Sequence, residues 1–524
     1  MSMAAQGGVA TASAQQALSG PISGSAPVLA TFALGLGSFM NFLDMSIANV
    51  SVPTIAGDLG VSPTEGTWVI TSYAVSEAIM LPLTGWLATR FGQVRLFVSA
   101  TLLFTGASVA CGLSVSFPML IGARVMQGVV GASMIPLAQT LLTGYYPVQK
   151  RSFALGLWSM TSILGPMVGP LAGGWLTENL SWHWVFLINL PFGLLVAGLV
   201  WALFRDREST RRRVPVDSVG LGLLVVGIGA LQIVLDLGNE LDWFGSRLII
   251  CLAAVASIAL ACFVAWELTD NHPIVDLRLF TRRNFAVGVT SLMLGAVAFF
   301  GTVVMLPLWL QSYQGYTALW AGKMLAFGGI LPVILGPLVG ANLNRIDARV
   351  VAAFGLLSFA VVAFWSARFT PDVDFWTVAA TRFFMGLGIS CFFLPIITIS
   401  LSGLPVERIA SASGISNFMR ILGSSFGTAI LTSTWEHKAI LQHARLAESV
   451  STYAPATQDY LLQLARLGLA PQAAFAQVDT VVTQQAYLMA TNAVLCLCGI
   501  LMVSIVLLVS LARPPFTIRG PGGH

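Results

Sequence analysis

The sequence predicts an all-α integral membrane protein built from two similar halves. Of its 524 residues, 56% are hydrophobic and only 9% are charged, whereas soluble domains carry about 25% charged residues. The apolar residues gather in runs of about the twenty residues that a helix needs to cross a bilayer. Parts of the chain also return at a fixed spacing. Composition, apolar runs and internal repeat together predict a helical bundle in the membrane.

Fourteen apolar runs, each of about 18–25 residues, have the length of a membrane-spanning helix. They lie at 28–52, 66–88, 95–114, 118–141, 152–177, 184–204, 217–236, 246–266, 284–309, 319–341, 349–366, 373–399, 408–433 and 482–511. Residues 1–27 carry no charge and lack the basic region of a signal peptide, so we expect a disordered tail there. Residues 512–524 form a second tail.

Basic residues between the predicted spans are unevenly distributed. Of the 26 Lys and Arg, 17 fall on the side that holds both chain ends, six on the other side and three within spans. Because cytoplasmic loops carry the excess of Lys and Arg, both termini are expected to be cytoplasmic. The net charge of +4 reflects this asymmetry and does not indicate a nucleic-acid surface. The six cysteines lie in spans and predict neither a disulfide framework nor a metal site.

The chain repeats itself at a constant offset of 258 residues. The matched pairs include Arg124 with Arg382, Gly128 with Gly386, Gly165 with Gly423, and Gly169 with Gly427. A second echo, at an offset of 255, pairs Gly85 with Gly340 and Arg90 with Arg345. We therefore expect two six-helix halves, 28–204 and 284–511, with a helix pair and its flanks inserted at 205–283. In transporters built from parallel repeats, the substrate lies near the midplane between the halves.

The predicted helix 152–177 carries a stripe of glycines at four-residue spacing, with prolines beside it. The stripe and its prolines are Gly165, Pro166, Gly169, Pro170 and Gly173. Such a bare stripe lets another helix approach closely, and neighbouring helices can satisfy the carbonyls that the prolines free. In the second half the proline positions hold Ser424 and Thr428. We therefore expect the stripe to lie where the halves meet, to serve conformational change, and to tolerate substitution less well than its repeat.

Asp44 lies on a small, polar face of the first predicted helix, so it is expected to face other helices or water rather than lipid. Burial disfavours the charged form of a carboxyl group, so such an acid can exchange a proton near neutral pH. An ionisable residue inside a membrane is by default a functional hypothesis. Asp44 is therefore a candidate proton carrier, and the alternative is a structural acid permanently paired with an arginine.

Two further charges inside spans are candidates for proton coupling. Glu77 could share proton carriage, could recognise cationic substrates, or could simply be solvated near the membrane surface. Arg124 shares a polar face with Gln127 and is expected to tune the acid, with a purely structural ion pair as the alternative.

Several polar, aromatic and sulfur-containing side chains within spans are candidates to line a substrate cavity. They are Asn41, Gln127, Trp158, Gln311, Met385 and Asn417. For each of them, lipid contact or ordinary packing is the alternative interpretation.

Four motifs together resemble the major facilitator superfamily, specifically its fourteen-helix drug–proton antiporters of the EmrB/QacA type. They are Leu43-Asp44-x-Ser46-Ile47-Ala48-Asn49-Val50-x-Val52-Pro53, Gly85-x-Leu87-Ala88-x-Arg90-x-Gly92-x-x-Arg95, Arg124-x-x-Gln127-Gly128 and Gly165-Pro166-x-x-Gly169-Pro170-x-x-Gly173-Gly174. The resemblance covers residues 28–511. The second motif departs from the family pattern at Thr89, where the family has an acid, and this puts the family's ionic latch in doubt.

The resemblance implies a major facilitator fold with two six-helix halves and two inserted helices, in a bacterial inner membrane with both termini cytoplasmic. It implies a proton-driven exporter of hydrophobic drugs that is not an enzyme and needs no cofactor besides the proton gradient. It assigns a gating role to Gly85, Arg90, Gly92 and Arg95, together with the glycine–proline stripe.

The resemblance also implies a periplasmic adaptor (EmrA-like) and an outer-membrane channel (TolC-like). The only long periplasmic segment, 434–481, is expected to form two short amphipathic helices joined at Ser449–Thr457, which either dock on the adaptor or lie on the membrane surface.

The chain has no G-x4-G-K-[ST] motif, so ATP is not expected to be the direct energy source. Two other functions stay open, an uptake symporter or facilitator for a small metabolite and a non-transporting scaffold or sensor.

Overall fold

The computed structural model describes residues 26–61, 63–146, 150–209, 211, 217–238, 241–270, 273–343, 345–451 and 454–516. These residues contain helices and no strand, and each of the fourteen predicted spans falls mainly on helical residues. Twelve described helices are long and apolar enough to cross a membrane. The prediction of an all-helical, multi-pass membrane protein is therefore confirmed. Residues 1–25 and 517–524, which hold most of the two predicted tails, lie outside the described residues.

The N-terminal half comprises α2 to α11. Its bounds are α2 (Ala26–Asp58), α3 (Pro63–Gly66), α4 (Trp68–Met80), η1 (Leu81–Leu83), α5 (Thr84–Phe91), α6 (Gln93–Gly112), α7 (Phe117–Gly131), α8 (Met134–Tyr145), α9 (Arg151–Asn179), α10 (His183–Leu187) and α11 (Asn189–Phe204). Three predicted helices are divided here, at residues 81–83, at residues 132–133 and at residue 188. Each break lies at a proline or within the four residues before one, namely Pro82, Pro136 and Pro191. A proline lacks an N–H group and clashes with the carbonyl four residues earlier, so each break has a local cause.

The inserted pair and the C-terminal half follow. Their bounds are η3 (Arg205–Arg207), α12 (Ser218–Leu237), η4 (Trp243–Gly245), α13 (Arg247–Thr269), η5 (Leu277–Thr281), α14 (Arg283–Tyr313), α15 (Ala318–Asn342), α16 (Ala348–Ser366), α17 (Phe375–Leu401), α18 (Val406–Ser449), α19 (Pro455–Arg466) and α20 (Pro471–Ser510). α12 packs against α4 of one half and α18 of the other, and Gln232 Nε2 on α12 donates to Ser425 Oγ on α18 at 2.7 Å.

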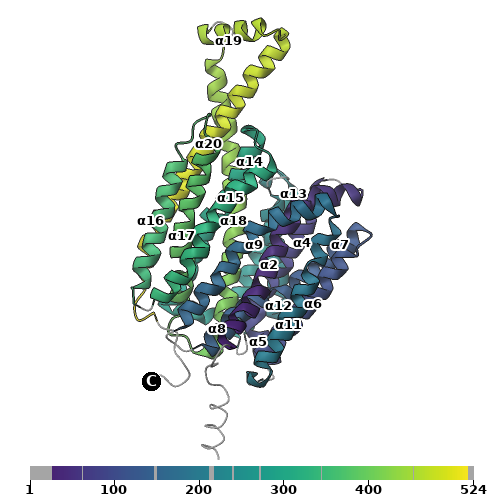
Figure 1. The fold of residues 1–524 in the computed structure, drawn as a ribbon, viewed down its shortest axis with the longest axis vertical. Helices are drawn as coiled ribbons and strands as arrows, with labels where there is room; N and C mark the ends of the chain where they lie inside the picture. The colour runs from purple at the N-terminus through teal and green to yellow at the C-terminus, as the bar shows by residue number, and fades with distance from the viewer. Residues whose placement is uncertain are drawn as a thin grey trace, which may run out of the picture.

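The bundle has two ends, which are named here by the parts of the chain that they carry. On the end called the terminal side, Tyr146 donates its hydroxyl to the carbonyl of Pro27 at 2.8 Å, and Asn284 Nδ2 donates to the carbonyl of Arg513 at 2.8 Å. The beginning of α2 and the end of α20 therefore lie on this side. The opposite end is called the hairpin side, because α18, α19 and α20 project from it (Figure 1).

The glycine–proline stripe of α9 packs against α2 of the same half. A Cβ atom on Gly165 would lie 2.5 Å from Phe42 Cβ, and one on Gly169 would lie 2.6 Å from Ser46 Cβ. The expectation that this stripe lies between the two halves is therefore wrong, because its bare face is filled by α2. Ser46 also donates its hydroxyl to the carbonyl of Pro166 at 3.3 Å, which is the carbonyl left free by Pro170.

The C-terminal half repeats this packing without prolines. A Cβ on Gly423 would lie 2.4 Å from the carbonyl oxygen of Met293, and one on Gly427 would lie 2.2 Å from that of Val297. The matched glycines therefore bring α18 against α14 as closely as α9 lies against α2.

The halves touch each other through other glycines near the terminal side. A Cβ on Gly156 of α9 would lie 2.8 Å from the carbonyl oxygen of Gly336 on α15, and one on Gly340 would lie 2.7 Å from that of Ser152. A second contact between the halves joins α5 to α18, where a Cβ on Gly85 would lie 2.6 Å from Cα of Ser411. Gly85 and Gly340, which the repeat relates, thus each lie in one of these two contacts, both on the terminal side.

The hairpin differs from the prediction for 434–481. α18 continues without a break to Ser449, and α20 already begins at Pro471, so only α19 is a separate short helix (Figure 1). The polar residues after Thr432 lower the hydropathy, but no glycine or proline follows there to end the helix before Ser449. Trp435 Nε1 donates to Thr491 Oγ1 at 2.8 Å and ties the two long helices together at the base of the hairpin.

Candidate functional site

Asp44 is fully buried and accepts three hydrogen bonds inside the N-terminal half. Its Oδ2 accepts from Arg124 Nη1 at 2.6 Å, and the two groups form an ion pair. Its Oδ1 accepts from Gln127 Nε2 and from Asn189 Nδ2, both at 2.8 Å. The acid of α2 is thereby bonded to α7 and to the first residue of α11.

Arg124 connects this network to a fourth helix. Its Nε donates to the carbonyl of Val69 on α4 at 2.8 Å, and its guanidinium lies 4.5 Å from the centre of the Tyr73 ring. Its Nη1 also donates to Gln127 Oε1 at 2.9 Å. Arg124 thus links Asp44 to the backbone of α4.

Asn189 is a member of this network that the sequence reasoning missed. Its Nδ2 donates to Ser108 Oγ at 2.9 Å as well as to Asp44, and Ser108 in turn donates to the carbonyl of Phe186 at 2.8 Å. The signal that could have found it is a lone amide in the otherwise apolar run 184–204.

Glu77 occupies a different environment on α4. Its side chain is fully buried, and neither carboxyl oxygen has a hydrogen-bond partner within the described part of the chain. The interpretation of Glu77 as a solvated surface acid is therefore wrong. The charges that act on it come from Arg420, on α18 in the other half, and from Asp44 and Arg124 in its own half.

The glycine of the Gln127-Gly128 motif brings α7 against α4 at this acid. A Cβ on Gly128 would lie 2.5 Å from the carbonyl oxygen of Tyr73 and 3.1 Å from the backbone nitrogen of Glu77. Arg124, the ion-pair partner of Asp44, and Glu77 are therefore held on adjoining helices, α7 and α4, with no room between their backbones at Gly128.

The profile of the Major Facilitator Superfamily matches residues 34–428. The chain belongs to this superfamily. It is 46% identical over 504 residues, covering 96% of this chain and 98% of the relative, to the protein named multidrug export protein EmrB of Escherichia coli. It is 42% identical, over 96% of this chain and 99% of the relative, to the fatty acid resistance protein FarB of Neisseria gonorrhoeae.

Solved structures show the same fold at low sequence identity. The human organic anion transporter MFSD10 (TETRAN) matches with a TM-score of 0.59 and 13% identity, over 92% of this chain and 99% of that chain. The proton:xylose symporter XylE matches with a TM-score of 0.58 and 13% identity, over 93% of this chain and 97% of that chain. The predicted major facilitator fold is confirmed, and the chain is a transporter rather than an enzyme.

In this superfamily transporter, Gly92 and its neighbours adopt a loop held by an acid from elsewhere in the chain. Gly92 has φ of +90°, a conformation that favours glycine. Glu208, which follows η3, accepts from the backbone nitrogens of Val94 at 3.1 Å and Arg95 at 2.9 Å. It therefore caps the start of α6, where unpaired N–H groups favour a negative charge. Thr89, at the place of the family's acid, donates instead to the carbonyl of Gly85 at 2.9 Å.

Three of the predicted substrate-contacting residues lie on helices that face the other half or their own half's core. Asn417 Nδ2 on α18 donates to Gln139 Oε1 on α8 at 3.1 Å, which is a hydrogen bond between the halves. Trp158 Nε1 donates to Ser38 Oγ at 2.8 Å. Asn41 donates to the carbonyl of Gly131 at 3.3 Å, while its Oδ1 has no partner within the described residues.

The other three predicted substrate contacts do not form one site. Gln127 is fully buried in the Asp44 network, so its placement on an open cavity is wrong. Met385 is buried in the C-terminal half, where its sulfur accepts from Arg382 Nη1 at 3.4 Å. Gln311 is exposed in the last turn of α14, on the hairpin side.

Proposed function

We propose that this transporter exports hydrophobic and amphipathic toxic compounds across a bacterial inner membrane in exchange for protons. The proteins named multidrug export protein EmrB in Escherichia coli and Haemophilus influenzae support this proposal, at 46% and 44% identity over nearly the whole chain. The orientation with both termini cytoplasmic follows from the distribution of basic residues. Superfamily transporters generally need no cofactor, and the proton gradient is the energy source in this proposal.

The observation that carries the proposal is the presence of two buried acids of opposite character on adjoining helices. Asp44 accepts three hydrogen bonds, whereas Glu77 accepts none within the described residues. An ionised carboxylate buried without donors is costly. In this conformation Glu77 therefore requires either a proton or a cationic group of a substrate, and these two ligands exclude each other.

Arg420 makes this competition depend on the position of the halves. It approaches Glu77 from α18, and its guanidinium lies 5.8 Å from the centre of the Phe42 ring of α2. If the halves rock so that Arg420 pairs with Glu77, the arginine displaces both proton and substrate. Binding on one side of the membrane and release on the other then follow from a single movement.

Asp44 and Arg124 are proposed to transmit the charge state within the N-terminal half. Protonation of Asp44 would replace one of its acceptor positions with a donor, and so would break its hydrogen bond with either an amide or Arg124. Because Arg124 also holds the Val69 carbonyl of α4, the change reaches the helix that carries Glu77. The predicted gating residues Gly165, Pro166, Gly169, Pro170 and Gly173 lie against α2 and are proposed to couple its movement to α9.

The projecting hairpin is proposed to bind a periplasmic adaptor (EmrA-like) that leads to an outer-membrane channel (TolC-like). It exposes large apolar side chains that a free surface rarely shows together. They are Ile440, Leu441, Leu462, Leu467, Phe475 and Val481. Replacing Leu462 and Leu467 by Glu is expected to abolish crosslinking to the adaptor and cellular resistance, with transport in vesicles unchanged. Retained crosslinking would show that the hairpin only lies on the membrane surface.

Purified protein in vesicles tests the direction of coupling. Tetraphenylphosphonium, a permanent hydrophobic cation, serves as substrate, and the membrane potential is clamped. Antiport predicts that an acidic vesicle interior drives the cation inward. An uptake symporter instead requires an alkaline interior, and a scaffold or sensor moves no cation under either gradient.

A further inference from the structure

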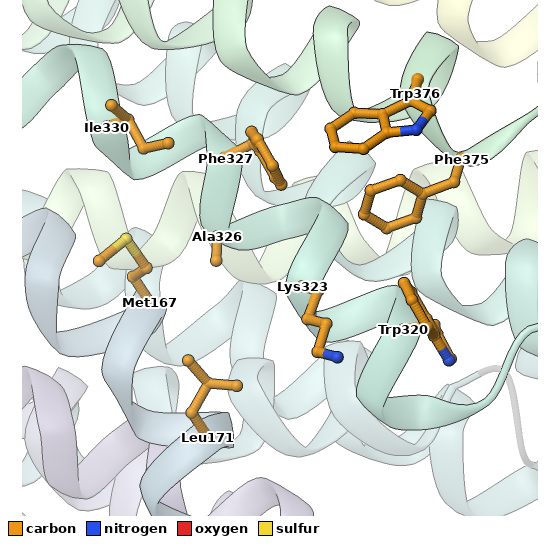
Figure 2. Close-up of a pocket in the computed structure, with 9 residues that line it drawn as sticks. All are labelled: Met167, Leu171, Trp320, Lys323, Ala326, Phe327, Ile330, Phe375 and Trp376. Atoms are coloured by element: carbon orange, nitrogen blue, oxygen red, sulfur yellow. The ribbon is translucent and has the colours of Figure 1, made fainter.

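A cavity of about 660 Å³ opens between the two halves on the hairpin side (Figure 2). Its walls come from three helices. Met167 and Leu171 come from α9, while α15 supplies Trp320, Lys323, Phe327 and Ile330. Phe375 and Trp376 come from the start of α17. This volume lies within the range of about 300–1,000 Å³ that small-molecule sites occupy.

The wall formed by α15 and α17 is a connected set of aromatic rings. The ring of Phe375 lies 5.2 Å from that of Trp320, 5.2 Å from that of Trp376 and 6.2 Å from that of Phe327. These contacts are edge to face, which is a favourable arrangement for aromatic pairs. The wall therefore offers a continuous apolar surface, which an alkyl chain can contact along its length.

Lys323 is the only ionisable residue among those that line the cavity. Its Nζ lies 4.3 Å from the centre of the Trp320 ring, and it forms no ion pair within the described residues. Asp374, the acid nearest in sequence to Trp376, accepts instead from the backbone nitrogens of Trp376 and Thr377. The cavity thus combines one uncompensated positive charge with an apolar surface.

We propose that this cavity binds a single-tailed amphipathic anion, a long-chain carboxylate, with its head group at Lys323 and its tail between α9 and α15. Charge complementarity selects an anion, and the aromatic wall with Met167 and Ile330 selects an alkyl chain. The size favours one tail, because a phospholipid with two tails is larger than a drug-sized ligand. The proposal deepens the proposed export function, since it names a class of compound that the transporter handles.

The position of the cavity makes binding depend on conformation. α9 and α15 touch through Gly156 and Gly336 near the terminal side and separate around the cavity on the hairpin side. A ligand in the cavity touches both halves and therefore favours the state in which they are apart on the hairpin side. In the proposed orientation this is the outer half of the membrane, where an exported amphiphile would leave into lipid.

The test uses radiolabelled palmitate and the full-length protein in nanodiscs of phosphatidylcholine. Lys323→Gln is expected to weaken palmitate binding about tenfold or more, because a hydrogen bond to a charged group contributes about 1.5–3 kcal/mol and 1.4 kcal/mol is tenfold. Lys323→Arg is expected to retain binding. The matched control is Lys438→Gln, which removes the other lysine on the hairpin side and leaves the cavity unchanged.

Two further measurements separate this inference from its alternatives. Hexadecanol, which has the same tail and no charge, should compete weakly. Ala326 of α15 also lines the cavity, so Ala326→Trp should block binding by filling it. Equal binding by Lys323→Gln and wild type would overturn the proposal, as would displacement of palmitate by phosphatidylglycerol in the disc. Glu77→Gln should abolish proton-coupled export yet bind palmitate normally, so a failure of the export mechanism is distinguishable from a failure of this site.

Discussion

Arg124 and Arg382 occupy matched positions in the two halves, and both side chains are fully buried. Arg124 forms an ion pair with Asp44 and bonds to Gln127 and the Val69 carbonyl. Among the described residues, the Arg382 side chain donates hydrogen bonds to Ser366 Oγ at 3.2 Å and to the sulfur of Met385, and its Nε has no partner there. One arginine thus belongs to a complete charge network, whereas the other lacks a counterion in the described part of the chain.

The close helix packing at the matched glycines is nevertheless repeated in the two halves. Gly165 meets Phe42 as Gly423 meets Met293, and Gly169 meets Ser46 as Gly427 meets Val297. This correspondence places Gly295 where the N-terminal half has Asp44. Helix contacts are thus repeated in the two halves, while the acids that we propose for proton coupling, Asp44 and Glu77, both lie in the N-terminal half.

The largest expected difference is between Arg124→Gln and Arg382→Gln. Arg124→Gln leaves Asp44 as a buried charge without its partner, which should cost about 3–5 kcal/mol of stability and abolish coupled transport. Arg382→Gln removes a buried charge that has no counterion among the described residues, so stability should be unchanged or slightly raised. Thermal unfolding of the purified variants measures both effects. Equal losses would mean that the arginines have the same structural role.

The glycine pair Gly169 and Gly427 tests whether packing is truly matched. The sequence predicted a milder effect at Gly427, but both positions meet main-chain or Cβ atoms at 2.6 Å or less. Leu at either position should therefore cost at least about 1–3 kcal/mol through overpacking. A thermal shift at Gly169→Leu alone would restore a special role for the stripe of α9.

The smallest expected difference concerns the helix starts on the terminal side. Glu208 caps α6 from a distant segment, whereas Asp347 caps the matched helix α16 from the adjacent position and accepts from the Arg349 backbone nitrogen at 2.9 Å. Alanine at either position should cost about 0.5–2 kcal/mol. Only Glu208→Ala should also increase proteolysis of 205–209, since that segment loses its attachment to α6.

A dependence on pH is expected at Asp347. Hydrogen bonds from the Arg349 side chain hold the pKa of Asp347 below its ordinary value. The stability from this depressed pKa is therefore present above about pH 4 and is lost as the pH falls through the lower, folded value. Both side chains are one-third exposed, so solvent screening keeps the effect to a few tenths of a kcal/mol. Asp347→Asn should show no such acid-induced loss in thermal unfolding.

The spans, the repeat and the placement of Asp44 and Arg124 against other helices were predictable, because apolar length and isolated intramembrane charges are local properties of the sequence. The hydrogen-bond partners of those charges were harder to predict. Asn189 joins Asp44 from 145 residues away, and Glu208 joins Arg95 from 113 residues away. Such contacts depend on which helices become neighbours, and the sequence pattern alone does not specify this.

The stripe of α9 shows a second limit. Its spacing correctly predicted a close helix contact, but could not distinguish α2 in the same half from α15 in the other. α9 meets α15 of the other half through Gly156, Gly336 and Gly340 instead, and none of these belongs to the stripe. The predicted end of one helix was wrong for a related reason. Hydropathy ends the predicted span at residue 433, whereas the backbone of α18 stays helical to Ser449.

Proton release on substrate binding tests most directly whether coupling resides in the N-terminal half. Tetraphenylphosphonium is added to purified protein in a weakly buffered detergent solution, and the change in pH is recorded. Wild type and Arg382→Gln are expected to release protons, because both retain Glu77, whereas Glu77→Gln should bind the cation weakly and release none. Proton release by Glu77→Gln equal to that of wild type would contradict the account.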